Sequence, residues 1–144
     1  MKTTPVKPMK CEIVSEGLLW IDRIASGVGV ILFDSQHKIA AGFHVLRGKS
    51  AGELTDNPAY FADTALAYVM EELQKRGVRK NISVAVAGGA SLLSSGIENL
   101  GSSLVGAVKE SLSLYGLPVK LESIGGTKLR NMILNVDEGK IRIS

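Results

Sequence analysis

The chain has 144 residues, 45% hydrophobic and 22% charged, and its 17 Lys and Arg against 14 Asp and Glu give a formal net charge of +3, the length and balance of one folded domain. Scattered cations and few aromatic residues (three Phe, three Tyr and one Trp) disfavour nucleic-acid binding, and the single cysteine excludes an internal disulfide or a cysteine-rich metal site. No apolar run approaches about 18 residues and no apolar core follows the basic N-terminus, so we expect a cytoplasmic protein without membrane insertion or a signal peptide.

The first part of the chain is predicted to begin with a tail and to continue as β-strands. Residues 1–10 contain two Pro and three Lys, so we expect a flexible basic tail, and we expect residues 11–144 to form a single domain. Residues 11–14 are predicted to form a short strand. Residues 28–33 are all apolar or glycine, as in a strand that is covered on both faces. The turn residues that follow, and the apolar run at 39–46, predict a hairpin between these two strands.

Two helices are predicted from their capping residues and their apolar spacing. The first begins at Asn57-Pro58, with Asn57 as the cap and Pro58 at the first helical position. Apolar residues then recur at helical spacing on one face, and Gly77 ends the helix. The second helix covers about 99–115, where apolar residues repeat every four positions, and it ends at Gly116.

The remaining apolar runs predict further strands. Residues 82–87 and 119–124 are each expected to form one strand, and 132–136 and 141–143 flank Asp137-Glu138-Gly139 as a hairpin. The order is hairpin, helix, strand, helix, strand, hairpin. This order predicts an α+β fold, with layered mixed β-sheets flanked by two helices.

Neither histidine defines a site by itself. His44 follows a strand and lies among apolar residues, where a lone histidine is more often a hydrogen-bonded structural group than a catalytic one. His37 lies in a turn beside Asp34 and is expected to be solvated. Two histidines placed so differently do not make a metal site, and no cofactor motif is present, so we expect neither a metal nor a cofactor.

Two turns of small residues are candidates for catalysis or binding. In the stretch IASGVGVILFD, Ser26 has no G-x-S-x-G elbow around it and would need a base within reach to act as a nucleophile. The Gly88-Gly89 turn could cradle an anion with its N–H groups, but it lacks the Lys-Ser/Thr ending of a phosphate loop, and close approach of two backbones is the favoured interpretation. Cys11 is expected to be a small buried hydrophobe.

Four segments together resemble the CheD family, the bacterial and archaeal chemoreceptor glutamine deamidases, over roughly residues 9–143. The segments are DNPAYFADTALAYVMEEL, VAVAGGASLL, LGSSLVGAVKESLSLYGLPV and IGGTKLRNMILNVDEGKIRI. The resemblance implies an α+β cysteine-hydrolase fold with a Cys-His pair and a supporting Thr. It also implies hydrolysis of receptor glutamine side chains to glutamate, and binding of CheC, a phosphatase that acts on phosphorylated CheY.

The resemblance also implies that the catalytic set is incomplete. The family turn is typically Gly-Ser-Cys-Val, and here Ala25 and Ser26 hold its first two positions while Gly27 stands at the position of the nucleophile. His44 falls on the family histidine, and Ile21 falls where the supporting threonine usually stands. On this alignment the base is retained, and the nucleophile and its helper are absent.

Further departures from the family pattern lie in the second half of the chain. Ser103 and Leu104 replace an Arg-Asn pair, and Thr127 replaces an Asn, whereas Arg130 matches. Several departures around one site indicate an inherited loss of the deamidase role rather than a single engineered change.

We therefore prefer the hypothesis of a CheD-like chemotaxis protein that is catalytically inactive and binds a receptor segment or a CheC-type phosphatase. The alternative is an active protein-glutamine deamidase or amidohydrolase in which His44 works with water or Ser26. A third hypothesis is a small-molecule binder that uses the Gly88-Gly89 turn.

Overall fold

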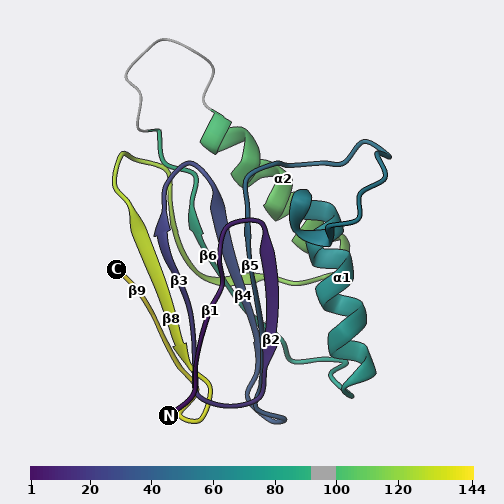
Figure 1. The fold of residues 1–144 in the computed structure, drawn as a ribbon, viewed down its shortest axis with the longest axis vertical. Coiled ribbons are helices and arrows are strands. Elements are labelled where there is room, and N and C mark those ends of the chain that lie inside the picture. Colours follow the sequence, from purple (N-terminus) through teal and green to yellow (C-terminus); the bar gives the residue numbers. More distant parts are fainter. Residues whose placement is uncertain (92–99) are drawn as a thin grey trace.

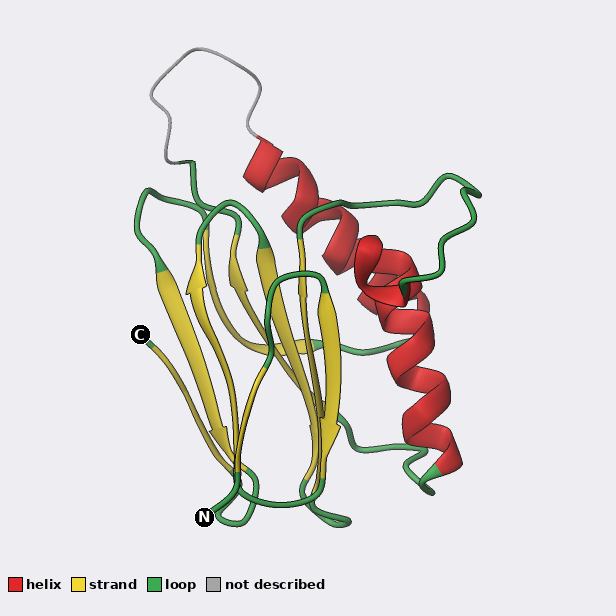
Figure 2. Ribbon diagram, viewed as in Figure 1, coloured by secondary structure: helices red, strands yellow, loops and turns green. Residues whose placement is uncertain are grey.

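The computed structural model describes residues 1–91 and 100–144 as two stacked β-sheets with two helices against one of them (Figures 1 and 2). The central sheet has five strands in the spatial order β2 (Lys10–Val14), β5 (Ile39–Val45), β4 (Val28–Asp34), β6 (Ser83–Gly88) and β7 (Val119–Ile124). Its pairs are antiparallel except β6 with β7, which is parallel. The β4–β5 hairpin predicted from the sequence is confirmed.

The second sheet has four strands and lies on the side of the central sheet away from the helices. Its spatial order is β1 (Thr3–Pro5), β3 (Leu18–Ile24), β8 (Arg130–Asn135) and β9 (Lys140–Ile143). β1 runs parallel to β3, and the other pairs are antiparallel. The predicted C-terminal hairpin is β8–β9, so the α+β layering expected from the sequence is confirmed.

Strand β4 is buried on both faces. Its side chains point alternately to opposite sides of the sheet, and each side is covered by a core. Val28, Val30 and Leu32 join the core under the helices. Ile31 and Phe33 join a second core between the two sheets. The wholly apolar composition of this strand is explained by these two cores.

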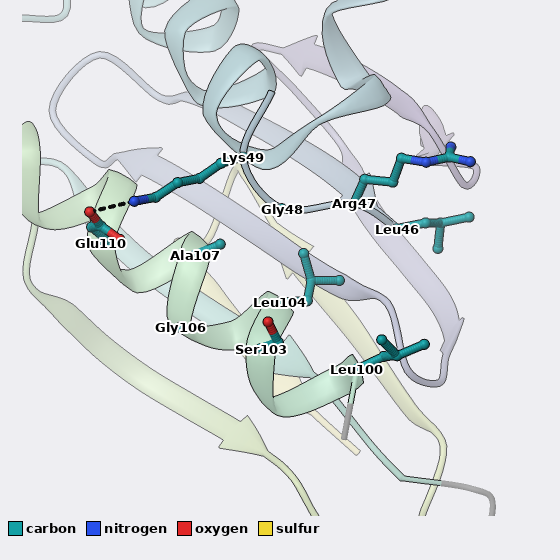
Figure 3. A pocket seen from close by; sticks show the side chains of 10 residues that line it. All are labelled: Leu46, Arg47, Gly48, Lys49, Leu100, Ser103, Leu104, Gly106, Ala107 and Glu110. Carbon is teal, nitrogen blue, oxygen red and sulfur yellow. Dashed lines mark hydrogen bonds and ion pairs between the residues drawn. The ribbon is translucent and has the colours of Figure 1, made fainter. Parts of the chain in front are cut away.

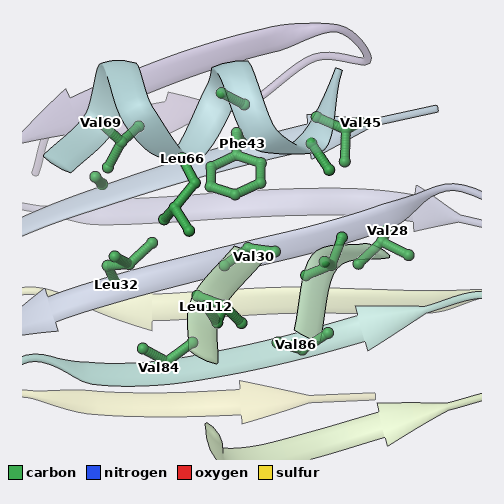
Figure 4. Packing of buried hydrophobic residues seen from close by; sticks show 14 of the residues in the cluster. Val28, Val30, Leu32, Phe43, Val45, Leu66, Val69, Val84, Val86 and Leu112 are labelled. Carbon is green, nitrogen blue, oxygen red and sulfur yellow. The ribbon is translucent and has the colours of Figure 1, made fainter. Parts of the chain in front are cut away.

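Two helices cover the outer face of the central sheet (Figure 4). They are α1 (Ala62–Lys75) and α2 (Leu100–Leu114). α1 is followed by Gly77 and α2 by Gly116, both with positive φ, as predicted. Residue 99, where we expected the second helix to begin, lies outside the described residues. No helix in the described ranges is long and apolar enough to span a membrane.

The start of the first helix differs from the prediction. Asn57 Oδ1 accepts a hydrogen bond from the Ala59 N–H at 3.0 Å, but it caps only the short 3₁₀ helix η1 (Pro58–Tyr60). Phe61 is extended, and α1 begins at Ala62. The break follows from tertiary contacts, since the Ala62 N–H donates to carbonyls of the preceding loop at 2.8 and 2.9 Å rather than to a carbonyl of η1.

The prediction of a flexible tail over residues 1–10 is wrong for residues 3–10. β1 is paired with β3, and Val6 is only 2% exposed within the core between the sheets. The Met9 N–H then donates to the His44 carbonyl at 2.7 Å, which carries the chain across to the central sheet. Proline and lysine are tolerated there because β1 is an edge strand.

Candidate functional site

The turn between β3 and β4 is held by backbone hydrogen bonds from the turn that follows β6. The Gly89 N–H donates to the Gly27 carbonyl at 2.9 Å, and the Ala90 N–H donates to the Ala25 carbonyl at 3.0 Å. Gly88 has φ +124°, and a Cβ there would lie 2.2 Å from the Gly27 oxygen. Close backbone approach is thus confirmed, and the anion cradle is wrong for this turn, because both N–H groups already bind carbonyls.

A β-bulge in β3 leads the chain into this turn. The β3–β8 register shifts between Ile21 and Ile24, and Arg23 within the bulge has φ +52°. The extra residue lets Ile21 and Ile24 both face the core between the sheets, where both are fully buried. A Cβ on Gly29 would lie 2.7 Å from Ile24 Cδ1 and 3.3 Å from Ile21 Cδ1. Gly29 therefore makes room for the two isoleucines, and Ile21 offers the site only an alkyl group.

His44 and Gly27 come together although they lie on different strands. His44 is 3% exposed and stands opposite Gly29 in the β4–β5 pairing. A Cβ placed on Gly27 would lie 3.2 Å from His44 Nε2. The two residues that the resemblance assigned to base and nucleophile are therefore neighbours, and the imidazole faces the position where a side chain of residue 27 would begin.

The imidazole of His44 is buried without full hydrogen bonding. Its Nδ1 has no hydrogen-bond partner among the described residues, so the expectation of a hydrogen-bonded structural histidine is wrong for this atom. Burial lowers the pKa of His44 below its usual 6.5, and the negative charge of Asp22 opposes that shift. The ring is thus neutral at neutral pH, which is the state a general base requires.

The space next to His44 where a nucleophile would stand is filled. A Cβ on Gly27 would lie 2.7 Å from Leu46 Cδ2 and 2.9 Å from the Val45 carbonyl oxygen. Both distances are shorter than ordinary van der Waals contact, so any side chain at residue 27 requires movement of the leucine and of the backbone. Sequence reasoning missed Leu46, because a leucine at a strand end gives no signal of its position over a turn 19 residues earlier.

Neither of the two other candidate nucleophiles is positioned to work with His44. Ser26 is exposed, and within the described ranges its hydroxyl makes no hydrogen bond to the imidazole. Cys11 pairs with Phe43 across β2 and β5, so its thiol lies on the helix side of the sheet, opposite to His44. Burial raises the pKa of Cys11 to about 12, which keeps the thiol protonated and unreactive. Cys11 is half-buried and packs against the core under the helices, so the expected buried hydrophobe is only partly matched.

His37 lies at the far end of the β4–β5 hairpin from Gly27. Its ring is exposed, as expected for a solvated turn residue, and its Nδ1 contacts the carboxylate of Asp34. The two histidines therefore cannot share a ligand. In the ranges that the structure describes, no group of three or more His, Cys, Asp and Glu side chains could hold a metal ion.

A groove opens beside the site, between α2 and the segment that follows β5 (Figure 3). Its volume is about 700 Å³, and Leu46 links it to the Gly27–His44 pair. Ser103 and Leu104, which replace the family's Arg-Asn pair by resemblance, line this groove. An ion pair of 2.7 Å between Lys49 and Glu110 joins its two sides. Two of the departures from the family pattern, Ser103 and Leu104, thus lie on this groove, whereas Ile21 and Thr127 do not line it.

Arg130, which matches the family pattern, supports the turn after β7. It is buried, its Nε donates to Ser123 Oγ at 3.0 Å, and its Nη1 donates to the Gly125 carbonyl at 2.5 Å. The neighbouring Gly126 carbonyl accepts from the Ser91 N–H at 2.8 Å. The arginine therefore holds this turn against the end of β6.

The structure defines an α+β protein of two stacked sheets and two helices, in which a buried histidine faces the turn before a central strand. A family model described as "CheD chemotactic sensory transduction" matches residues 47–144. The chain is 36% identical over 121 residues to the chemoreceptor glutamine deamidase CheD of Thermotoga maritima, covering 83% of this chain and 76% of that protein. The chain belongs to the CheD family.

Two further relatives carry similar names. The probable chemoreceptor glutamine deamidase CheD of Clostridium novyi is 33% identical over 126 residues, covering 83% of this chain and 78% of that protein. The corresponding protein of Methanococcus vannielii is 32% identical over 123 residues, covering 83% and 80%. Among solved structures, the hypothetical protein YfiH of Bacillus licheniformis gives a TM-score of 0.42 at 13% identity, covering 78% of this chain and 51% of that one. The family-model match begins after His44, so residues 21, 27 and 44 all precede it.

Proposed function

We propose that this CheD-family protein serves chemotaxis by binding a partner and that it does not hydrolyse amides. In a cysteine amidase, a thiolate attacks the amide carbon while a histidine first accepts and later returns a proton. Gly27 has no atom for this attack. The observation that carries the proposal is the filled space at residue 27, where the leucine and a backbone carbonyl lie within 3 Å of a Cβ position.

The groove next to Gly27 is the proposed binding surface. By family resemblance its partner is a segment of a methyl-accepting chemotaxis receptor or a CheC-type phosphatase. Leu46 is 48% exposed and Leu100 is 73% exposed at the rim of the groove, an apolar rim that a helix of a partner can cover. Nucleic acid and membrane insertion are not part of this proposal.

The alternative function is an active deamidase in which His44 activates water or Ser26. One observation supports this alternative: a buried neutral histidine with an unpartnered Nδ1 is unusual for a purely structural residue. The two proposals differ in whether product is released.

The first test is hydrolysis of a receptor. The purified chain is incubated with a cytoplasmic receptor fragment that contains the modifiable glutamines, and ammonia release and the mass change from glutamine to glutamate are followed. We expect no more ammonia or glutamate than in a control that lacks this protein. Product that disappears in a His44→Ala variant would overturn the inactive proposal and establish the alternative.

The second test is binding at the groove. We expect Leu100→Glu to weaken binding of the receptor fragment, or of a CheC-type phosphatase, by about tenfold, since a buried apolar contact would be lost and a charge introduced. Leu114→Glu is the matched control, because Leu114 lies on the same helix, is 82% exposed and lies outside the groove. Equal affinities of the two variants, measured by calorimetry, would place the partner elsewhere on the protein.

A further inference from the structure

A second cavity lies between the two sheets at the other end of β4 from Gly27. Its volume is about 320 Å³, at the lower end of the range for small-molecule sites, about 300–1,000 Å³. Its lining is mainly apolar and comes from β4, β6, β7, β8, β9 and the β8–β9 turn. The apolar side chains of this lining are Ile31, Phe33, Val84, Ala85, Leu121, Leu134 and Ile141.

A bulge in β7 places a cation at the rim of this cavity. In the β6–β7 ladder Val84 pairs with Val119 but Ala85 pairs with Leu121, so Lys120 is the extra residue. An extra residue re-aims a side chain that regular alternation would send to the other face. Lys120 accordingly lines the cavity together with Leu121.

The rim is positive and hydroxyl-bearing. Lys120 Nζ donates to Ser83 Oγ at 3.5 Å, and Ser35 also lies at the rim. The lining contains no Asp or Glu. Among the described residues, no carboxylate pairs with Lys120. The ammonium group is thus available to an external anion next to the apolar lining of the cavity.

We propose that this cavity binds a medium-chain fatty acid, with the alkyl chain against its apolar lining and the carboxylate at Lys120. Removal of each methylene from water favours the bound state by about 0.8 kcal/mol, and the carboxylate complements the one cation of the lining. The size of the cavity selects a medium chain over a long one. This site is at the opposite end of β4 from the groove, so the inference does not rest on the proposed chemotaxis function.

The test uses decanoate below its critical micelle concentration and isothermal titration calorimetry on the full chain. We expect saturable binding to one site, weakened about fivefold by Lys120→Gln. Lys128→Gln is the control, because Lys128 is exposed and lies outside the cavity. Decanol should bind equally to the wild-type chain and to Lys120→Gln, since it lacks the charge.

Filling the cavity tests its location. Ala85→Met should abolish decanoate binding, and if that variant fails to fold, Leu121→Trp narrows the entrance from a half-exposed edge position. Absence of saturable decanoate binding to the wild-type chain would overturn the proposal. Equal binding by the wild-type chain, Lys120→Gln and the filled variants would also overturn it, because the ligand would then sit elsewhere.

Discussion

Gly27→Cys should destabilise the protein by about 1–3 kcal/mol and should not produce deamidation. The Cβ of the new residue would lie 2.7 Å from Leu46 Cδ2 and 2.9 Å from the Val45 oxygen. A leucine end can rotate away, whereas the carbonyl belongs to the end of β5 and moves only with its strand. Urea unfolding measures the first effect, and ammonia release from a receptor fragment measures the second.

The double variant Gly27→Cys, Leu46→Ala separates the two obstacles. Removal of the leucine side chain should recover part of the lost stability and expose the thiol to His44, whose Nε2 lies 3.2 Å from the Cβ position. Reactivity of the thiol with iodoacetamide should then exceed that of the single variant. Leu54→Ala is the matched control, since Leu54 is fully exposed in the loop before α1. A single Gly27→Cys variant that is as stable as the wild-type chain and releases ammonia would show that the pocket is not closed.

His44→Leu should stabilise the protein, and the gain should grow as the pH falls. The buried Nδ1 without a partner costs about 1–3 kcal/mol, which an apolar side chain of similar size does not incur. In an inactive protein the substitution sacrifices no catalysis. His44→Gln, which keeps a buried polar group, is the control and should show no such gain.

The pH dependence follows from the lowered pKa of His44. Between the folded pKa and the usual value of 6.5, the unfolded chain binds a proton that the folded chain does not. Stability therefore falls as pH drops through 6.5, and this contribution is absent in His44→Leu. Urea unfolding at about pH 7.5 and about pH 5.5 measures it. A larger loss of stability for His44→Leu at the lower pH would mean that the folded imidazole is protonated and paired.

Much of the fold could be predicted because its signals are local. The apolar run of β4, the Asp137-Glu138-Gly139 turn and the helix-ending glycines act through nearest neighbours in sequence. The N-terminal strand could not be predicted, because Thr3–Pro5 contains no apolar run and its partner β3 lies further along the chain. The predicted start of the first helix at Asn57-Pro58 was wrong for a similar reason, since the Ala62 N–H donates to carbonyls of a loop that precedes η1.

The candidate site divides in the same way. Family resemblance, rather than any local pattern, paired Gly27 with His44, and the structure brings them together. The resemblance could not indicate that Leu46 covers the position of the missing side chain at residue 27, because that contact depends on how β5 ends above the turn. Nor could the sequence show that Ile21 packs into the space that a side chain at Gly29 would occupy.

The pairing of β3 with β8 has a consequence for the order of folding. One wall of the core on the His44 side is supplied by Met132 and Leu134, near the C-terminal end of the sequence. During synthesis this face of the central sheet stays open to water until residues 130–143 have left the ribosome. Contacts between such distant segments slow folding, and uncovered strands favour aggregation. We therefore expect nascent chains of this protein to depend on chaperones until the last hairpin docks.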